Sequence, residues 1–360
     1  MSGIQTKKQR IVSIELLRIL AMLMVVMLHY LSKGELLEAM TGPLSANGYI
    51  AWLIEAFAIV AVNVYMLISG FFLVESGFKA GRIAELVCQV LFYSLLVPPV
   101  LMALGILHAE DLTIYKLLQY IFPTQMEHYW FATAYVIMYL FCPLLSTAVR
   151  AMKREQLRTT ILLLLLLFSV GKSVLPVRLT MDKLGYDGLW FMCVFLVAAY
   201  MRLYGFSFFR SAKQSFLCYA GACLSIYLWT LGLHLLYMKT EHFDDFLLSA
   251  YSYNHVLNLL AAISLFQVFY HWEISGESFG AKWIVRIAPY TFGVYLLHEH
   301  LELRTLWPKW LGASLEEGPA LLVIRAVAAV FLVFVIGIAV DMLRGRLFAL
   351  AKRVFRKADN

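Results

Sequence analysis

The stretch IELLRILAMLMVVMLHY, residues 14–30, is apolar enough to cross a lipid bilayer, yet it carries three ionisable side chains. A transmembrane helix needs about 20 predominantly apolar residues, and this apolar run extends over roughly 11–31. Glu15, Arg18 and His29 are expensive to place in hydrocarbon, so each of them indicates either a pairing partner or a function. The stretch therefore predicts both a membrane helix and a candidate site on that helix.

The composition predicts a polytopic, all-α membrane protein. Hydrophobic residues make up 62% of the 360 residues and charged residues 15%, whereas soluble domains contain about 45–50% and about 25%. No linker divides the chain, so we expect one membrane domain over residues 1–345 and a basic cytoplasmic tail over 346–360. About ten transmembrane helices are predicted, at roughly 11–31, 50–74, 84–107, 129–147, 160–175, 185–204, 216–238, 254–270, 286–307 and 320–343.

Basic residues are distributed unevenly between the predicted connections. With the N-terminus inside, 20 of the 30 Lys and Arg residues lie on the inner side and 8 on the outer side, while Arg18 and Arg325 lie within the membrane. The positive-inside rule therefore predicts that both termini are cytoplasmic. The net charge of +7 is spread over many short loops. Topology and anionic lipid headgroups account for it, and no nucleic-acid partner is predicted.

The three ionisable residues of the first helix lie on one face. Arg18 and His29 are 11 residues apart, which is three helical turns and about 16 Å along the axis. Glu15 lies one turn before Arg18 and can pair with it at i,i+3. One interpretation is a polar stripe that crosses much of the membrane. The alternative is a neutralised Glu15–Arg18 pair with His29 at the outer interface.

Six motifs in order resemble the integral-membrane acyltransferase-three family. The first is the spacing of Arg18 and His29, with Glu15 where the family usually has Asp. Further stretches similar to the family's later motifs are NVYMLISGFFL (63–73) followed by Lys79-Ala-Gly-Arg82, YWFATAYVIMYLFCPLL (129–145), LWFMCVFLVAAYMRLY (189–204, with Ala198 where Gly is usual), YNHVLNLLAAISLFQVF (253–269) and YTFGVYLLHEH (290–300). The resemblance implies transfer of an acyl group, usually acetyl, from cytosolic acyl-CoA to a hydroxyl of an extracytoplasmic glycan.

The resemblance assigns candidate catalytic roles to five residues. His29 is the candidate general base, because an imidazole titrates near neutral pH. Arg18 would orient or polarise the donor, with Glu15 holding it. His298 matches the terminal His of a late-helix motif and would support the site or bind the acceptor, with Glu299 as the next candidate. The alternative for His298 and Glu299 is a polar outer interface. His298-Glu299-His300 lacks the spacing of a two-histidine metal site, so no metal is predicted.

Candidate binding residues lie at both ends of the predicted helices and, for Asn63, near the middle of the membrane. Lys79 and Arg82 would contact the phosphates of acyl-CoA by charge, and positive-inside topology explains them equally well. Asn63 is either interhelical glue or a substrate contact, and Ser69-Gly70 predicts close packing of helices. Candidate acceptor contacts are His128, Trp130, Trp190 and Arg325. An outer aromatic belt is the alternative for the two Trp residues, and pairing with Glu299 or Glu302 is the first expectation for Arg325.

A multi-pass transporter or glycan flippase without covalent chemistry is the alternative function. Such a carrier would also keep ionisable residues in the membrane, but it would more often show repeated halves and broken helices in matching positions. For the acyltransferase, the resemblance implies membrane lipids and a glycan or lipid-linked sugar as partners. Glycan-assembly proteins and further copies of the chain are additional candidates. The implied location is the cytoplasmic membrane of a bacterium.

Overall fold

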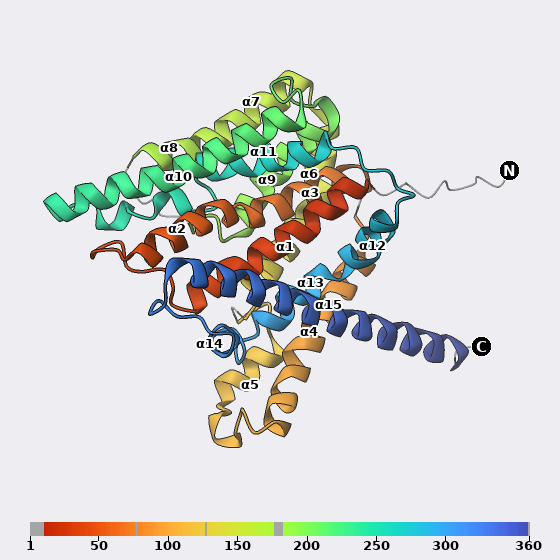
Figure 1. Ribbon diagram of the computed structural model, residues 1–360. Helices are drawn as coiled ribbons and strands as arrows, with labels where there is room; N and C mark the ends of the chain where they lie inside the picture. The colour runs from red at the N-terminus through yellow and green to blue at the C-terminus, as the bar shows by residue number, and fades with distance from the viewer. Residues whose placement is uncertain (1–10, 77, 127, 176–182, 359–360) are drawn as a thin grey trace.

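The described residues form helices joined by turns and loops, with no strand among them (Figure 1). The computed structural model describes residues 11–76, 78–126, 128–175 and 183–358, with side chains as far as residue 353. The α-helices are α1 (Val12–Lys33), α2 (Ala46–Ala58), α3 (Ala61–Ser76), α4 (Ala80–Ala103), α5 (Ile114–Ile121), α6 (Trp130–Ala151), α7 (Arg154–Leu165), α8 (Gly171–Val174), α9 (Gly188–Tyr204), α10 (Ala212–Thr240), α11 (Val256–Tyr270), α12 (Phe279–Ile287), α13 (Thr291–His298), α14 (Leu306–Trp310) and α15 (Pro319–Ala358).

Seven helical stretches of the described chain are long and apolar enough to cross a membrane. They are Val12–Lys33, Ala46–Ser76, Ala80–Ala103, Trp130–Ala151, Arg154–Val174, Ala212–Thr240 and Pro319–Arg353. The other three predicted spans correspond to shorter helices, namely α9, α11 and α13. The predicted all-α membrane fold is thus confirmed, while the helices that meet the length criterion are fewer than the ten predicted.

Two predicted helices are interrupted. The span predicted at 50–74 begins earlier, at Ala46, where the Ser45 side chain accepts a hydrogen bond from the N–H of Gly48, and it breaks between α2 and α3. The span predicted at 286–307 was wrong as a continuous helix, because α13 ends at His298 and a turn leads to α14. No Gly or Pro lies between 298 and 305. Tertiary contacts of this turn, described below, therefore end the helix.

Helix α1 lies at the centre of the bundle. It packs against α2, α3, α11, α12, α13 and α15, and Figure 1 shows it crossing the molecule between them. The α4–α5 hairpin projects from the body, at the bottom of the view. Helix α15 continues to Ala358, so the described part of the predicted tail extends this helix. The first ten residues, whose basic side chains entered the topology prediction, lie outside the described residues.

Helices α3 and α9 approach closely at Gly70, as the small residues at 69–70 predicted. A Cβ atom added at Gly70 would lie 2.8 Å from the Cβ of Ala198 and 3.1 Å from the Cα of Phe195. Backbones in a membrane bundle can come this close only where side chains are small. The contact matters for function because α3 carries residues of the cavity described below.

We expect Gly70→Leu to destabilise the protein by about 1–3 kcal/mol, because the added side chain overpacks the α3–α9 contact. Gly221→Leu on α10 is the matched control, since a Cβ there meets no atom within 4 Å. Thermal unfolding of the purified protein in detergent measures both variants. Equal unfolding temperatures for the two variants would contradict the close approach.

Candidate active site

His29 lies near the C-terminal end of α1 and contacts two side chains from the end of α13. Its Nδ1 atom is 2.8 Å from His298 Nε2 and 3.3 Å from Glu299 Oε2. The Glu299 carboxylate is buried and its Oε1 lies 3.8 Å from Arg304 Nη1. The structure therefore brings together three of the five predicted catalytic residues, from segments that are 269 residues apart.

The end of α13 allows two consecutive residues to face one site. Neighbouring residues of a helix point about 100° apart. Glu299, however, is already outside the helix, with φ −93° and ψ 7°. Its side chain can therefore turn toward His29 beside that of His298, while His300 points elsewhere and contacts the carbonyl of Ser94 at 3.3 Å.

His298 is held on both sides. Its Nδ1 lies 2.6 Å from the carbonyl oxygen of Val294, one turn earlier in α13. Its own carbonyl accepts a 3.1 Å hydrogen bond from the indole N–H of Trp307, whose ring lies edge-on at a centroid distance of 5.8 Å. Because the side chain is 3% exposed, its orientation is set by the protein and not by solvent.

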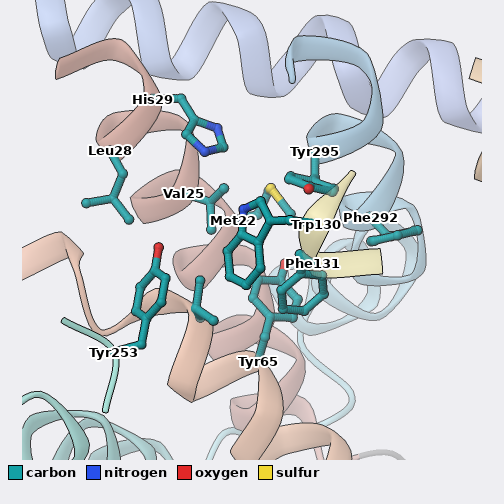
Figure 2. A pocket seen from close by; sticks show the side chains of 11 residues that line it. Met22, Val25, Leu28, His29, Tyr65, Trp130, Phe131, Tyr253, Phe292 and Tyr295 are labelled. Carbon is teal, nitrogen blue, oxygen red and sulfur yellow. The ribbon is translucent and has the colours of Figure 1, made fainter. Parts of the chain in front are cut away.

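An apolar cavity lies beside His29, between α1, α3, α6 and α13. Its volume of about 30 Å³ has room for one or two water molecules. Figure 2 shows the side chains that converge around it. They are Met22, Val25, Leu28, His29, Val62, Tyr65, Trp130, Phe131, Tyr253, Phe292 and Tyr295. Aromatic side chains make up most of its walls, and His29 is its one imidazole.

Arg18 and Glu15 form the predicted pair on the same helix. Arg18 Nη1 donates to Glu15 Oε2 at 2.7 Å, and the Tyr65 hydroxyl donates to the Arg18 carbonyl at 3.0 Å. The Arg18 side chain is 27% exposed and that of Glu15 is 10% exposed. A guanidinium has five N–H donors, so the pair neutralises the charge and leaves donors for a ligand. Arg18 lies about 16 Å along α1 from His29.

A row of aromatic rings connects the cavity to Lys79 and Arg82. Along α6, the ring centroids of Phe131 and Tyr135 are 6.3 Å apart and those of Tyr135 and Tyr139 are 6.2 Å apart, nearly parallel in both cases. The Tyr139 hydroxyl accepts a hydrogen bond from the N–H of Lys79 at 3.0 Å. Sequence reasoning missed this row, although aromatic residues at every fourth position of YWFATAYVIMYLF are its signal.

Lys79 and Arg82 lie together where α4 begins. Lys79 is the residue before the helix, and Arg82 donates from Nη1 to the Ser76 hydroxyl at 3.2 Å. Both side chains are exposed.

Asn63 and Trp190 are bonded to each other and not to the cavity. The Asn63 amide donates to the Tyr253 carbonyl at 2.7 Å and to Asn258 Oδ1 at 3.1 Å, and its oxygen accepts from the Trp190 indole at 2.9 Å. Both side chains are buried. Of the two readings of Asn63, the geometry favours interhelical glue, and it gives Trp190 the same role. The network positions Tyr253 at the cavity wall, where Trp130 also lies.

His128 supports the turn after α13. Its ring stacks on Tyr129 with a centroid distance of 4.0 Å, and its Nε2 accepts a hydrogen bond from the N–H of Leu301 at 3.2 Å. Because it is 1% exposed, this geometry favours a structural role over the predicted acceptor contact. Glu302 is bound nearby by the Tyr120 hydroxyl at 2.6 Å and by Lys116 at 3.1 Å. These contacts bend the chain away from the helix that the sequence predicted.

Arg325 pairs with a residue that the sequence analysis did not name. Its Nη1 lies 2.6 Å from Glu317 Oε2. The expected pairing with Glu299 or Glu302 was therefore wrong, because those carboxylates contact His29 and Arg304 in one case and Lys116 and Tyr120 in the other. Glu317 lies in the turn that leads into α15. The sequence does not give the distances from Arg325 to Glu299, Glu302 and Glu317, so it cannot identify which of them is the partner.

Glu55 is a buried acid that the sequence analysis did not single out. It lies within the apolar run of α2 and is 7% exposed, and its Oε2 has no hydrogen-bond partner among the described residues. An acid inside a membrane segment is a functional candidate by default. Its isolation in the sequence, without a motif around it, is why it went unnoticed.

One family model, described as an acyltransferase domain, matches residues 11–342. The chain belongs to this acyltransferase family. It is a multi-pass membrane protein of that family, with His29, Arg18 and the described cavity inside the matched region. No curated protein and no solved structure matches the acyltransferase significantly. Among the residues that the structure describes, no group of three or more His, Cys, Asp or Glu is placed to hold a metal ion.

We expect Asn63→Ala to lower the free energy of unfolding by about 1–3 kcal/mol, because it leaves buried partners without hydrogen bonds. Ser225→Ala, on the exposed side of α10, is the control. Thermal unfolding compares the two. An unchanged unfolding temperature together with weaker acceptor binding would return Asn63 to the role of a substrate contact.

Proposed function

We propose that the protein is an integral-membrane O-acyltransferase that moves an acyl group, most simply acetyl, from cytosolic acyl-CoA to a hydroxyl of an extracytoplasmic glycan. The observation that carries this proposal is the placement of His29 at one end of an aromatic path and of Lys79 and Arg82 at the other. A base near the acceptor and cations near the donor phosphates are what the transfer needs.

His29 acts at the acceptor. The imidazole takes the proton of the acceptor hydroxyl while the oxygen forms a bond to the thioester carbonyl carbon. The C–S bond then breaks, and the leaving thiolate receives the proton from the imidazolium. An ester and free CoA thiol result, so atoms and charge balance without a covalent intermediate on the protein. Exclusion of bulk water by the apolar walls favours transfer to the bound hydroxyl over hydrolysis.

The donor extends from the cations toward His29. Lys79 and Arg82 hold the nucleotide phosphates by charge-assisted hydrogen bonds. The thiol-bearing arm lies along Tyr139, Tyr135 and Phe131. Arg18 offers its remaining donors beside this path, because its carbonyl is bonded by Tyr65, whose ring centroid is 6.2 Å from that of Phe131. The rise of α1 between Arg18 and His29, about 16 Å, calls for an extended, flexible donor such as an acylated pantetheine arm.

The acceptor side is aromatic. Trp130 and Tyr253 line the cavity, and their rings stack at a centroid distance of 5.7 Å. Tyr186, which is 42% exposed, contacts both rings at 4.6 Å. Such rings combine apolar faces with polar edges, as a sugar ring requires. We place the protein in the cytoplasmic membrane of a bacterium, with a glycan or lipid-linked sugar as acceptor.

Transfer is tested with the protein in lipid nanodiscs, radiolabelled acetyl-CoA and lipid-linked or soluble oligosaccharides. We expect His29→Gln to lower kcat by about 10²–10⁴-fold, the usual contribution of a general base. His271→Gln is the matched control, because His271 is bonded to the Phe209 carbonyl away from the cavity. Activity retained in His29→Gln would remove this residue from the mechanism. Substrate movement into vesicles without any acyl transfer would instead support a transporter.

The donor site is tested with two thioesters. We expect Lys79→Ala and Arg82→Ala each to raise KM for acetyl-CoA about tenfold, because each removes a charge-assisted hydrogen bond to phosphate. Neither variant should change KM for S-acetyl-pantetheine, which lacks the nucleotide phosphates. Lys213→Ala, at the start of α10, is the control for loss of a basic charge. Equal effects on both donors would contradict the phosphate contact.

A further inference from the structure

We propose that His298 selects the tautomer of His29, so that His29 Nε2 is the atom that accepts the proton of the acceptor hydroxyl. The inference rests on the proposed transferase function for its chemical consequence. The tautomer itself can be observed without any substrate. It makes His298 a positioning residue that acts through His29, and it explains why two imidazoles meet in an apolar site.

The carbonyl of Val294 determines which nitrogen of His298 carries hydrogen. His298 Nδ1 lies 2.6 Å from this oxygen, and a carbonyl oxygen can only accept a hydrogen bond. The hydrogen is therefore on Nδ1. A neutral imidazole has one N–H and one acceptor nitrogen, so Nε2 of His298 presents a lone pair.

That lone pair determines the tautomer of His29. His298 Nε2 is 2.8 Å from His29 Nδ1, so His29 must donate from Nδ1. The opposite arrangement would direct the lone pair of His298 Nδ1 at the Val294 carbonyl. His29 Nε2 is then the basic nitrogen, and the imidazole lies at the cavity (Figure 2). The remaining ring nitrogen of a base is commonly oriented by such a second group.

This hydrogen-bond arrangement of Val294, His298 and His29 is compatible with the proton balance of the transfer. His29 Nε2 takes the hydroxyl proton and later gives it to the leaving thiolate, while the Nδ1 hydrogen stays on His29 throughout. His298 neither gains nor loses a proton. During the step His29 carries a positive charge, and Glu299 Oε2 lies 3.3 Å from its Nδ1.

Glu299 acts on His29 by charge. The Nδ1 hydrogen points to His298, and Glu299 Oε2 has no hydrogen-bond partner among the described residues. The carboxylate is nevertheless close enough to stabilise the imidazolium. Lys33 on α1 and Arg304 in the turn after α13 place positive charge near His29, and Arg304 Nη1 lies 3.8 Å from Glu299 Oε1.

The kinetic test uses paired substitutions of His298. His298→Leu removes the acceptor, and we expect kcat to fall by about 10²–10⁴-fold, as when a base is left in the wrong tautomer, with KM for both substrates unchanged. His298→Gln keeps a carbonyl acceptor and an N–H donor, and should retain at least tenfold more activity than His298→Leu. His234→Gln is the matched control, because His234 of α10 is a buried histidine that is bonded to the carbonyl of Met40. Equal activity of His298→Leu and His298→Gln, both folded, would overturn the proposal.

The tautomer is read directly by NMR of protein labelled with ¹⁵N-histidine in nanodiscs. Subtraction of the His29→Gln spectrum assigns the His29 signals. We expect hydrogen on Nδ1 of His29 in the unmodified protein and loss of this preference in His298→Leu. Hydrogen on Nε2 in the unmodified protein, or an unchanged tautomer in His298→Leu, would overturn the proposal. If the tautomer is as expected but no acyl transfer is found, the proposed function is wrong, while the proposal that His298 selects the tautomer of His29 stands.

Discussion

Polar and ionisable side chains inside an apolar bundle need partners, and this constraint organises the structure of the protein. A charged group is expensive in hydrocarbon. Glu15 therefore pairs with Arg18 and Asp341 with Arg344, each within one helix. His29 is bonded instead to a residue 269 positions further along the chain. The His29–His298 contact thus joins the first helix to the end of α13 and places both beside the cavity.

The same constraint explains why α13 ends where it does. The turn after His298 directs Glu299 to His29, His300 to the Ser94 carbonyl and Glu302 to Tyr120. A straight helix would have pointed consecutive residues about 100° apart and left some of these groups without partners. Ending the helix therefore gives His300 and Glu302 their hydrogen-bond partners and, at the same time, brings His298 and Glu299 beside His29.

Sequence reasoning recovered the parts of the fold that depend on local pattern. The apolar runs located α1, α4, α6, α9, α10 and α11 to within about four residues, and they located the start of α15 but not its end. The i,i+3 pairing of Glu15 with Arg18 follows from helix geometry alone. The break between α2 and α3, the end of α13 and the partner of Arg325 were missed or mistaken. Each depends on contacts between distant segments, and no local pattern encodes them.

By itself, the sequence determined that the chain is a helical membrane protein with three ionisable residues on one face of its first helix, because apolar length and residue spacing are local properties. Only the tertiary structure decided which polar residues face the cavity. Asn63, Trp190 and His128 are candidate substrate contacts in the sequence, but their hydrogen bonds are made to neighbouring helices and turns. Hydrogen bonds form only at about 3 Å and with suitable direction. Which polar group serves structure and which serves chemistry is therefore settled when the helices pack.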